Sequence, residues 1–362
     1  MRCSAVGSIA ARSIIAAGRH TAAGSRRCEL FCRQKCVSFT LNDGCSGGWI
    51  LALQIRNGSI TNSVCDNGCS AGCEKDECDR LDHSSYSLLN FNDAPSYLKF
   101  NPYIRTGYRG YLTTKMCLES VFWWTNETIN IWSHIFGWML FLGLTLYDLV
   151  LLNIHASFAD KFIVGVLLGC FQICMILSSL YHTFSCRSEK DYLCFLSFDL
   201  FGIALSLLAI YMSGVYYAFW CHKNLQLFYL LTVSLIFLFA MIIQIPRLRV
   251  DANMKLIVFV CWAAYGVVPT FHWTVIMGGY ANPVVQLLLP RVLGMYAISG
   301  LAFFIYMSKI PERFFSGKVD YIGSSHQWWH LFVVLALYYW HNTGIKYVEF
   351  RMNHGCANDM RL

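Results

Sequence analysis

From about residue 126 onward the chain is a series of long apolar runs separated by short polar breaks. Each run has about 18–25 residues, the length that a helix rising about 1.5 Å per residue needs to cross ~30 Å of hydrocarbon. In that solvent every backbone polar group must be bonded internally, which favours helices over irregular chain. The sequence therefore predicts seven membrane-spanning helices, near 128–152, 162–184, 193–217, 225–245, 256–277, 291–308 and 326–345.

The composition supports an all-α membrane protein. Of the 362 residues, 56% are apolar and only 14% are charged, whereas soluble domains are about a quarter charged. Aromatic residues make up 16% of the chain, as expected where two interfacial aromatic belts are present. The net charge of +7 is spread over loops and tail. Nucleic-acid binding needs a basic stripe on a soluble face, so we expect no nucleic-acid partner.

The distribution of Lys and Arg near the span ends predicts the orientation, because cytosolic loops carry the excess. The amino-terminal side of the spans has eleven: Arg105, Arg109, Lys115, Arg187, Lys190, Arg247, Arg249, Lys255, Lys309, Arg313 and Lys318. The opposite side has six: Lys161, Lys223, Arg291, Lys346, Arg351 and Arg361. We therefore expect the amino terminus to lie in the cytosol.

Four segments follow from these patterns. Residues 1–90 carry nine of the seventeen cysteines and are expected to be a disordered cytosolic segment. Residues 91–125 form a juxtamembrane segment in which 113–124 reads as a short amphipathic helix at the membrane interface. Residues 126–346 form the seven-helix domain, and 347–362 a short lumenal or extracellular tail. The eight cysteines beyond residue 90 are interpreted as small apolar side chains.

Ionisable residues inside the spans point to function, because such groups are costly at bilayer depth. In the predicted topology the second span ends on the cytosolic side with Ser178 and His182. The third span begins there, with Asp199 about two turns in. The seventh also begins there with His326 and His330, which are four residues apart and share one helical face. Topology thus predicts that these five side chains meet just inside the cytosolic leaflet.

Three imidazoles suit zinc and leave a fourth tetrahedral position for water, which is the catalytic pattern. We therefore predict that His182, His326 and His330 bind zinc, which would activate the water and polarise a carbonyl group. Asp199 would hold the water or take its proton, and Ser178 would donate to the developing oxyanion. A site at this depth would reach the amide or ester linkage of a lipid. Haem bound between two histidines is the chemical alternative, although two histidines on one face fit a compact metal better.

Other polar residues of the spans are interpreted structurally. Glu127 and Asn130 either cap the first span or brace the site, and capping is favoured. Asp148 is expected at the membrane interface. The remaining membrane histidines are expected to hydrogen-bond between helices; they are His134, His155, His222, His272 and His341.

Three motifs carry a resemblance to a known family. They are Asn126-Glu-Thr-Ile-Asn-Ile-Trp-Ser-His134, Ser178-Ser-Leu-Tyr-His182 and Ser325-His-Gln-Trp-Trp-His330. With Asp199 in the third span, they resemble the progestin and adipoQ receptor family over roughly residues 95–350. The resemblance implies seven spans, a cytosolic amino terminus, zinc on His182, His326 and His330, and water held or activated by Ser178 and Asp199.

Further stretches narrow what the resemblance implies. These are 101–111, 211–219 and 309–317, which resemble a Golgi branch of the family. That branch tethers a Raf-type kinase to the membrane and damps MAP kinase signalling, so sequestration of Raf is the principal function implied. The alternatives are a zinc-dependent, ceramidase-like lipid amide hydrolase and an adiponectin- or steroid-type receptor. A multi-pass protein of the Golgi membrane is expected, with the plasma membrane as the alternative and a ceramide-like lipid as ligand.

Overall fold

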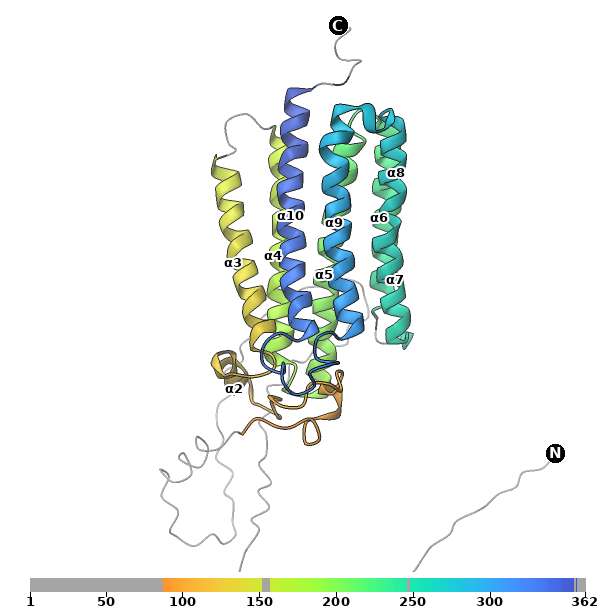
Figure 1. Ribbon diagram of the computed structural model, residues 1–362. Coiled ribbons are helices and arrows are strands. Elements are labelled where there is room, and N and C mark those ends of the chain that lie inside the picture. Colours follow the sequence, from red (N-terminus) through yellow and green to blue (C-terminus); the bar gives the residue numbers. More distant parts are fainter. Residues whose placement is uncertain (1–86, 152–156, 246–247, 355, 357–362) are drawn as a thin grey trace, which may run out of the picture. The chain divides into compact units, whose positions relative to one another are not determined.

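The computed structural model describes residues 87–151, 157–245, 248–354 and 356. The cysteine-rich segment up to residue 86 therefore lies outside the described residues. Within the described ranges the chain is helical, and its only β pairing is an isolated bridge between Leu89 and Tyr108. The helices, labelled as in Figure 1, are α2 (Thr114–Glu119), α3 (Thr128–Leu151), α4 (Phe158–Phe184), α5 (Glu189–Ala218), α6 (Lys223–Ile242), α7 (Ala252–Tyr265), α8 (Val267–Ile276), α9 (Pro283–Ser308) and α10 (Ser325–Asn353).

Within the described residues, six helical stretches are long and apolar enough to cross a membrane, and each overlaps one of the first six predicted spans. They are Thr128–Asp148, Phe158–Phe184, Glu189–Ala218, Lys223–Ile242, Ala252–Ile276 and Pro283–Ser308. The fifth of these stretches consists of two consecutive helices, α7 and α8. The chain is thus a multi-pass helical membrane protein.

Helix α10 covers the predicted seventh span and has 29 residues, but it is too polar to meet the same criterion. Several of its polar side chains are buried inside the bundle, namely Gln327, His330, His341 and Thr343. On its outward side the apolar residues Leu331, Leu335 and Tyr338 are exposed at helical spacing. The helix packs against α9 and α3 along the bundle (Figure 1).

Helices α9 and α10 extend furthest beyond their predicted spans. Helix α9 begins at Pro283 rather than 291, because the Asn282 side chain accepts a hydrogen bond from the amide of Val284 and proline suits the first helical position. Helix α10 continues to Asn353 rather than ending at 345. Its last turn carries Arg351, whose guanidinium pairs with a buried carboxylate of α4 and lies 3.4 Å from the centre of the Trp220 ring.

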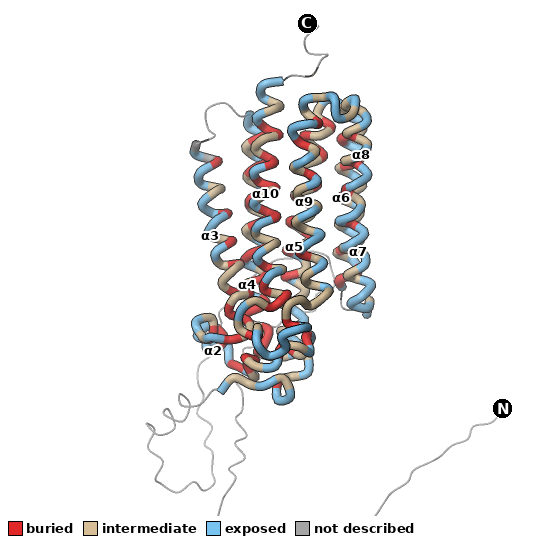
Figure 2. The backbone as a smooth tube through the Cα atoms, in the orientation of Figure 1, coloured by how far each residue is buried: buried red, intermediate tan, exposed pale blue. Residues whose placement is uncertain are grey.

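The bundle is held by a continuous apolar core along α4. Neighbouring helices in contact are α3 with α4, α4 with α5, α5 with α6, and α10 with α9 and α3. Phe141 from α3 and Leu168, Phe171 and Met175 from α4 are fully buried between them. Figure 2 shows this pattern as buried stretches that face the interior, while the outer faces, which would contact lipid, are exposed.

One end of the bundle, where α4 ends and α10 begins, is covered by residues 87–125 and 309–324. We call these two segments the cap; hydrogen bonds join them to each other and to the start of α10. Glu312, which is fully buried, accepts hydrogen bonds from the amide of Asn101 and from the backbone N–H of Ser325 at 2.8 and 2.7 Å. Asp320 accepts from the backbone N–H groups of Arg105 and Thr106 at 3.0 and 2.8 Å. These two carboxylates attach the juxtamembrane segment to the start of α10.

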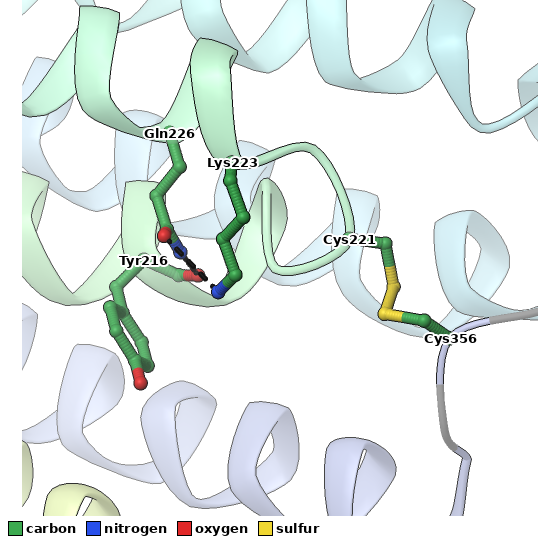
Figure 3. The surroundings of a disulfide bond; sticks show 5 residues. All are labelled: Tyr216, Cys221, Lys223, Gln226 and Cys356. Atoms are coloured by element: carbon green, nitrogen blue, oxygen red, sulfur yellow. Dashed lines mark hydrogen bonds between the residues drawn. A yellow bond between two sulfur atoms is a disulfide. The ribbon is translucent and has the colours of Figure 1, made fainter. Parts of the chain in front are cut away.

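The opposite end of the bundle is closed by a disulfide between Cys221 and Cys356 (Figure 3). Cys221 follows α5, and Cys356 follows α10, 135 residues later in the sequence. The bond links the turn before α6 to the carboxyl-terminal end of α10. Treating these two cysteines as small apolar residues was therefore wrong.

Gly266 marks the break between α7 and α8. The Tyr211 hydroxyl, which lies on α5, donates to the carbonyl of Trp262 at 2.6 Å and accepts from the backbone N–H of Gly266 at 3.0 Å. A Cβ on residue 266 would lie 2.3 Å from the hydroxyl oxygen of Tyr296 and 2.7 Å from the Tyr211 ring. Glycine is required here because two tyrosines approach the backbone from neighbouring helices.

We predict that Gly266→Ala lowers the thermal midpoint of the protein, with an overpacking cost of about 1–3 kcal/mol. Gly300→Ala in α9 is the matched control, because a Cβ there meets nothing within 4 Å and alanine favours the helix by roughly 0.5–1 kcal/mol. The midpoint is measured by fluorescence in detergent. An unchanged midpoint for Gly266→Ala would show that the tyrosines move away freely.

Candidate metal centre

Three histidines converge at the capped end of the bundle. His182 lies in the last turn of α4, while His326 and His330 occupy the first two turns of α10. Because α4 runs toward the cap and α10 runs away from it, residues distant in sequence reach the same level. His182 and His330 are each 2% exposed. The structure thus brings together all three histidines that the sequence predicted.

The rings are spaced for a metal ion. Each histidine offers one ring nitrogen, and these three atoms lie within 4.8 Å of one another. The Nε2 atoms of His326 and His330 are 3.3 Å apart. Two nitrogens bound to one tetrahedral zinc at about 2.0–2.1 Å would be separated by about 3.3 Å. The cluster could therefore hold a metal, and this pair already has the spacing that zinc requires.

Several buried ring nitrogens of the cluster have no hydrogen-bond partner. Nε2 of His182 is buried without a hydrogen-bond partner, as is Nδ1 of both His326 and His330. A buried polar atom without a partner carries a desolvation cost of about 1–3 kcal/mol. For His182 a metal bond would remove that cost, so the donor set fits a metal.

Glu127 determines which ring nitrogen of His182 donates a hydrogen bond and which one is left to face the centre. Its Oε2 lies 2.7 Å from Nδ1 of His182, and it accepts a second hydrogen bond from the Asn130 amide at 2.7 Å. Burial alone would raise the pKa of the Glu127 carboxyl, but the His182 imidazole and the Arg109 guanidinium lower it below its usual value. An ionised carboxylate only accepts, so Nδ1 of His182 donates to Glu127, which leaves Nε2 as the ring nitrogen that faces a metal.

Glu127 was expected mainly to cap the first span, and that interpretation was wrong. The start of α3 is capped instead by the threonines on either side of Glu127. The Thr125 hydroxyl accepts a hydrogen bond from the backbone N–H of Glu127 at 3.1 Å. The Thr128 hydroxyl accepts from the backbone N–H of Thr125 at 2.8 Å. The side chain of Glu127 is therefore free to reach across to α4.

His134 belongs to the same cluster of rings, although it was expected to hydrogen-bond between helices. Its ring centre lies 4.0 Å from that of His330, and both of its nitrogens are buried without partners. The sequence spacing could have predicted this position of His134. Glu127, Asn130 and His134 are three and four residues apart, so they share one face at the start of α3. That face is turned toward the centre.

Asp199 and Ser178 also lie at the centre. Both are buried, and the Asp199 carboxylate interacts with the Ser178 hydroxyl and with His182. One carboxylate oxygen, Oδ1, has no partner. Ser178 precedes His182 by one turn of α4, as its spacing predicted. All five residues of the predicted constellation thus meet in one place.

Arg109 is a residue of the cap that the sequence did not single out beyond its charge. It is 3% exposed and donates to the Thr183 carbonyl at 3.1 Å and to the carbonyl of His182 itself. Its guanidinium also donates a hydrogen bond to the Ser120 hydroxyl at 2.7 Å. Arg109 therefore holds the end of α4, and with it a predicted ligand, against the cap.

Three more ionisable groups of the spans form interhelical contacts, whereas His222, which was expected to do so, has a buried Nδ1 without a hydrogen-bond partner. Asp148, the last residue of the first candidate span, is 5% exposed and its Oδ2 lies 2.5 Å from Nε2 of His341; its interfacial depth stays a prediction. His341 does bond between helices, as expected, and so does His272, whose Nδ1 is 2.8 Å from the Tyr229 hydroxyl. His155 lies outside the described residues.

An apolar cavity of about 120 Å³ lies between α5, α8, α9 and α10, away from the histidines. Its lining includes Gly214, Phe219, Trp340 and Tyr347. Trp340 is ten residues beyond His330, which is about 15 Å along the helix. The cavity is therefore separate from the histidine cluster.

The fold and the site together describe a multi-pass helical membrane protein with a buried cluster of histidines at one end of its bundle. Comparison with known proteins agrees: residues 122–341 match the haemolysin-III-related family. A human protein called progestin and adipoQ receptor family member 3 is 43% identical over 277 residues, which are 75% of this chain and 89% of that protein. The mouse protein of the same name is also 43% identical.

More distant relatives include a plant protein and an insect protein. Heptahelical transmembrane protein 3 of Arabidopsis thaliana is 30% identical over 69% of this chain and 84% of its own length. The adiponectin receptor protein of Drosophila melanogaster is 29% identical over 70% of this chain and 58% of its own length. The chain belongs to the haemolysin-III-related family and, within it, to the progestin and adipoQ receptor proteins.

Proposed function

We propose that His182, His326 and His330 bind one zinc ion and that this centre hydrolyses the amide bond of a membrane lipid of the ceramide class. The convergence of three imidazole nitrogens within 4.8 Å carries the proposal. A bound zinc ion would polarise the amide carbonyl and lower the pKa of water at its open position toward ~7. The resemblance to adiponectin receptors suggests the substrate class.

The chain's own groups have separate tasks in this proposal. Asp199, with its unpartnered Oδ1, would take the proton as water attacks the amide carbon. Ser178 would donate its hydroxyl to the carbonyl oxygen as charge develops there. Glu127 would keep Nε2 of His182 directed at the centre. The bond between carbonyl carbon and nitrogen would then break, and the amine would leave with that proton.

The orientation we propose places the cap in the cytosol and α10 as the seventh span. The exposed apolar stripe on α10 supports a spanning helix. The disulfide between Cys221 and Cys356 supports the orientation, because such bonds persist in oxidising compartments. Its end of the bundle would be lumenal, which agrees with the Lys and Arg count. A site one to two turns inside the cytosolic end would meet a lipid near its headgroup linkage.

We predict about one zinc per chain in the purified protein and none in His326→Ala. Glu127→Gln should bind zinc about 10–100-fold more weakly, because the lost carboxylate no longer orients His182. His272→Gln is the matched control, since that histidine bonds Tyr229 away from the cluster. Elemental analysis and competition with a chelator measure both effects. A metal-free wild-type protein prepared without chelator would end the zinc proposal.

We predict that Asp199→Asn retains zinc but hydrolyses ceramide about 10²–10⁴-fold more slowly, because a general base has been removed. Release of fatty acid in nanodiscs is the measurement, with zinc content determined on the same sample. Equal rates in the wild type and the variant would exclude Asp199 as the base. An inactive wild type that holds its zinc would exclude the hydrolase and leave a metal-stabilised bundle.

A second function is favoured by the 43% identity to progestin and adipoQ receptor family member 3 over 89% of its length. We propose that this chain resides in Golgi membranes, binds a Raf-type kinase through its cytosolic side and so damps MAP kinase signalling. This role is compatible with hydrolysis, because the metal centre lies inside the bundle and a kinase would bind outside it.

We predict that overexpression moves fluorescent Raf from the cytosol to Golgi membranes and lowers phosphorylation of the downstream kinase. His326→Ala tests whether recruitment needs the metal centre and should recruit Raf as well as the wild type does. Microscopy with a Golgi marker is the measurement. Raf that remains cytosolic at high expression of a correctly localised protein would contradict the scaffold.

A further inference from the structure

Two buried thiols are in contact where the cap meets the end of α4. Cys117 lies in α2 and Cys186 in the turn between α4 and α5, and their sulfur atoms are 3.7 Å apart. They are 0% and 1% exposed and belong to one apolar cluster with Leu112 and Tyr108. Among the described free cysteines, no other pair is in hydrogen-bonding contact.

We propose that Cys117 and Cys186 are a redox-responsive pair, which a hydroperoxide converts to a disulfide that tethers α2 to the end of α4. A disulfide has its sulfurs about 2.05 Å apart, so the pair must close by less than 2 Å. Helix α2 has only six residues and Cys186 lies in a short turn, so both sides can make this shift.

The chemistry balances with the peroxide as oxidant. The thiolate of Cys186 attacks one peroxide oxygen and becomes a sulfenic acid, while the other oxygen leaves as hydroxide and takes up a proton. The sulfur of Cys117 then attacks the Cys186 sulfur and expels the second oxygen as water. In sum, two thiols and one hydrogen peroxide give one disulfide and two waters. Burial favours this small, neutral oxidant over glutathione disulfide.

The surroundings of the pair assign the first step to Cys186. The hydrogen bond from the Cys117 thiol lowers the pKa of Cys186, and the Arg109 guanidinium lowers it further, although burial opposes both. The same hydrogen bond raises the pKa of Cys117, which therefore remains the thiol that resolves the sulfenic acid. The more acidic partner thus reacts first.

The tether would act on the metal centre through Arg109. Its guanidinium bonds the Ser120 hydroxyl, which in turn donates to the Cys117 carbonyl at 2.7 Å. The same guanidinium bonds the carbonyls of His182 and Thr183, close to Cys186. A disulfide would close this ring covalently and restrain the turn of α4 that carries His182.

The proposal assumes the cytosolic cap proposed above, because a reducing compartment keeps such a pair open until an oxidant arrives. The test uses the full chain in nanodiscs, treated with graded hydrogen peroxide and then with a thiol-blocking reagent. Mass spectrometry without reductant should find a cross-linked Cys117–Cys186 peptide that dithiothreitol removes. The thermal midpoint should rise by several degrees on oxidation and return on reduction.

Matched variants separate this pair from the other thiols. Cys117→Ser and Cys186→Ser should each lose the cross-link and the thermal shift, whereas Cys261→Ser, at an exposed cysteine, should keep both. The proposal fails if the wild-type pair stays reduced while the exposed Cys194 and Cys261 oxidise. It also fails if Cys186 is recovered as a sulfinic acid beside an unmodified Cys117, or if both are already cross-linked when isolated under a thiol blocker.

The rate of metal release tests whether the Cys117–Cys186 disulfide affects the metal centre. Zinc-loaded oxidised protein should lose metal to a chelator several-fold more slowly than the reduced protein, and Cys186→Ser should show no such difference on peroxide treatment. Equal rates would overturn the link from the tether to His182. The cross-link and thermal shift are measured without added metal, so failure of the zinc proposal would be distinguishable from failure of this one.

Discussion

The convergence of buried imidazoles at the end of a membrane bundle is the constraint on which the rest of this structure depends. Ionisable groups inside a membrane are tolerated when they bind one another, water or a metal. Here the nitrogen that faces the centre from α4 has no protein partner. The surrounding helices must therefore hold it in place, and α3, α4, α10 and the cap all contribute contacts that do so.

The polarity of α10 is a consequence of the same constraint. The helix carries two of the three clustered histidines, a capping box formed by Ser324 and Gln327, and a buried hydrogen bond between His341 and Asp148. These groups make it less apolar than the six candidate spans, although its outward stripe remains apolar. A helix that lines a polar centre has a lower mean hydropathy than one that contacts only lipid and apolar neighbours.

The sequence predicted much of the fold and the centre because bilayer thickness and chain direction are simple rules. Run length located the helices, and alternation of direction placed His182 and His326 at one end. Glu127 and Arg109 were misread or overlooked because their partners depend on how the cap folds over the bundle, which no periodicity records. The disulfide was missed for a similar reason: its two cysteines are 135 residues apart, and neither lies in a recognisable pattern.

The arrangement gives the cap a role that neither proposed function alone would require. Glu312 ties the segment around Asn101 to the residue before His326, and Arg109 ties the segment before α3 to the carbonyl of His182. Phe100, also from the cap, packs against the His326 ring with 5.8 Å between centres. Both helices that supply the histidines are thus held by one short stretch of chain. Displacing that stretch would free the end of α4 and the start of α10, and with them the three rings on which the centre depends.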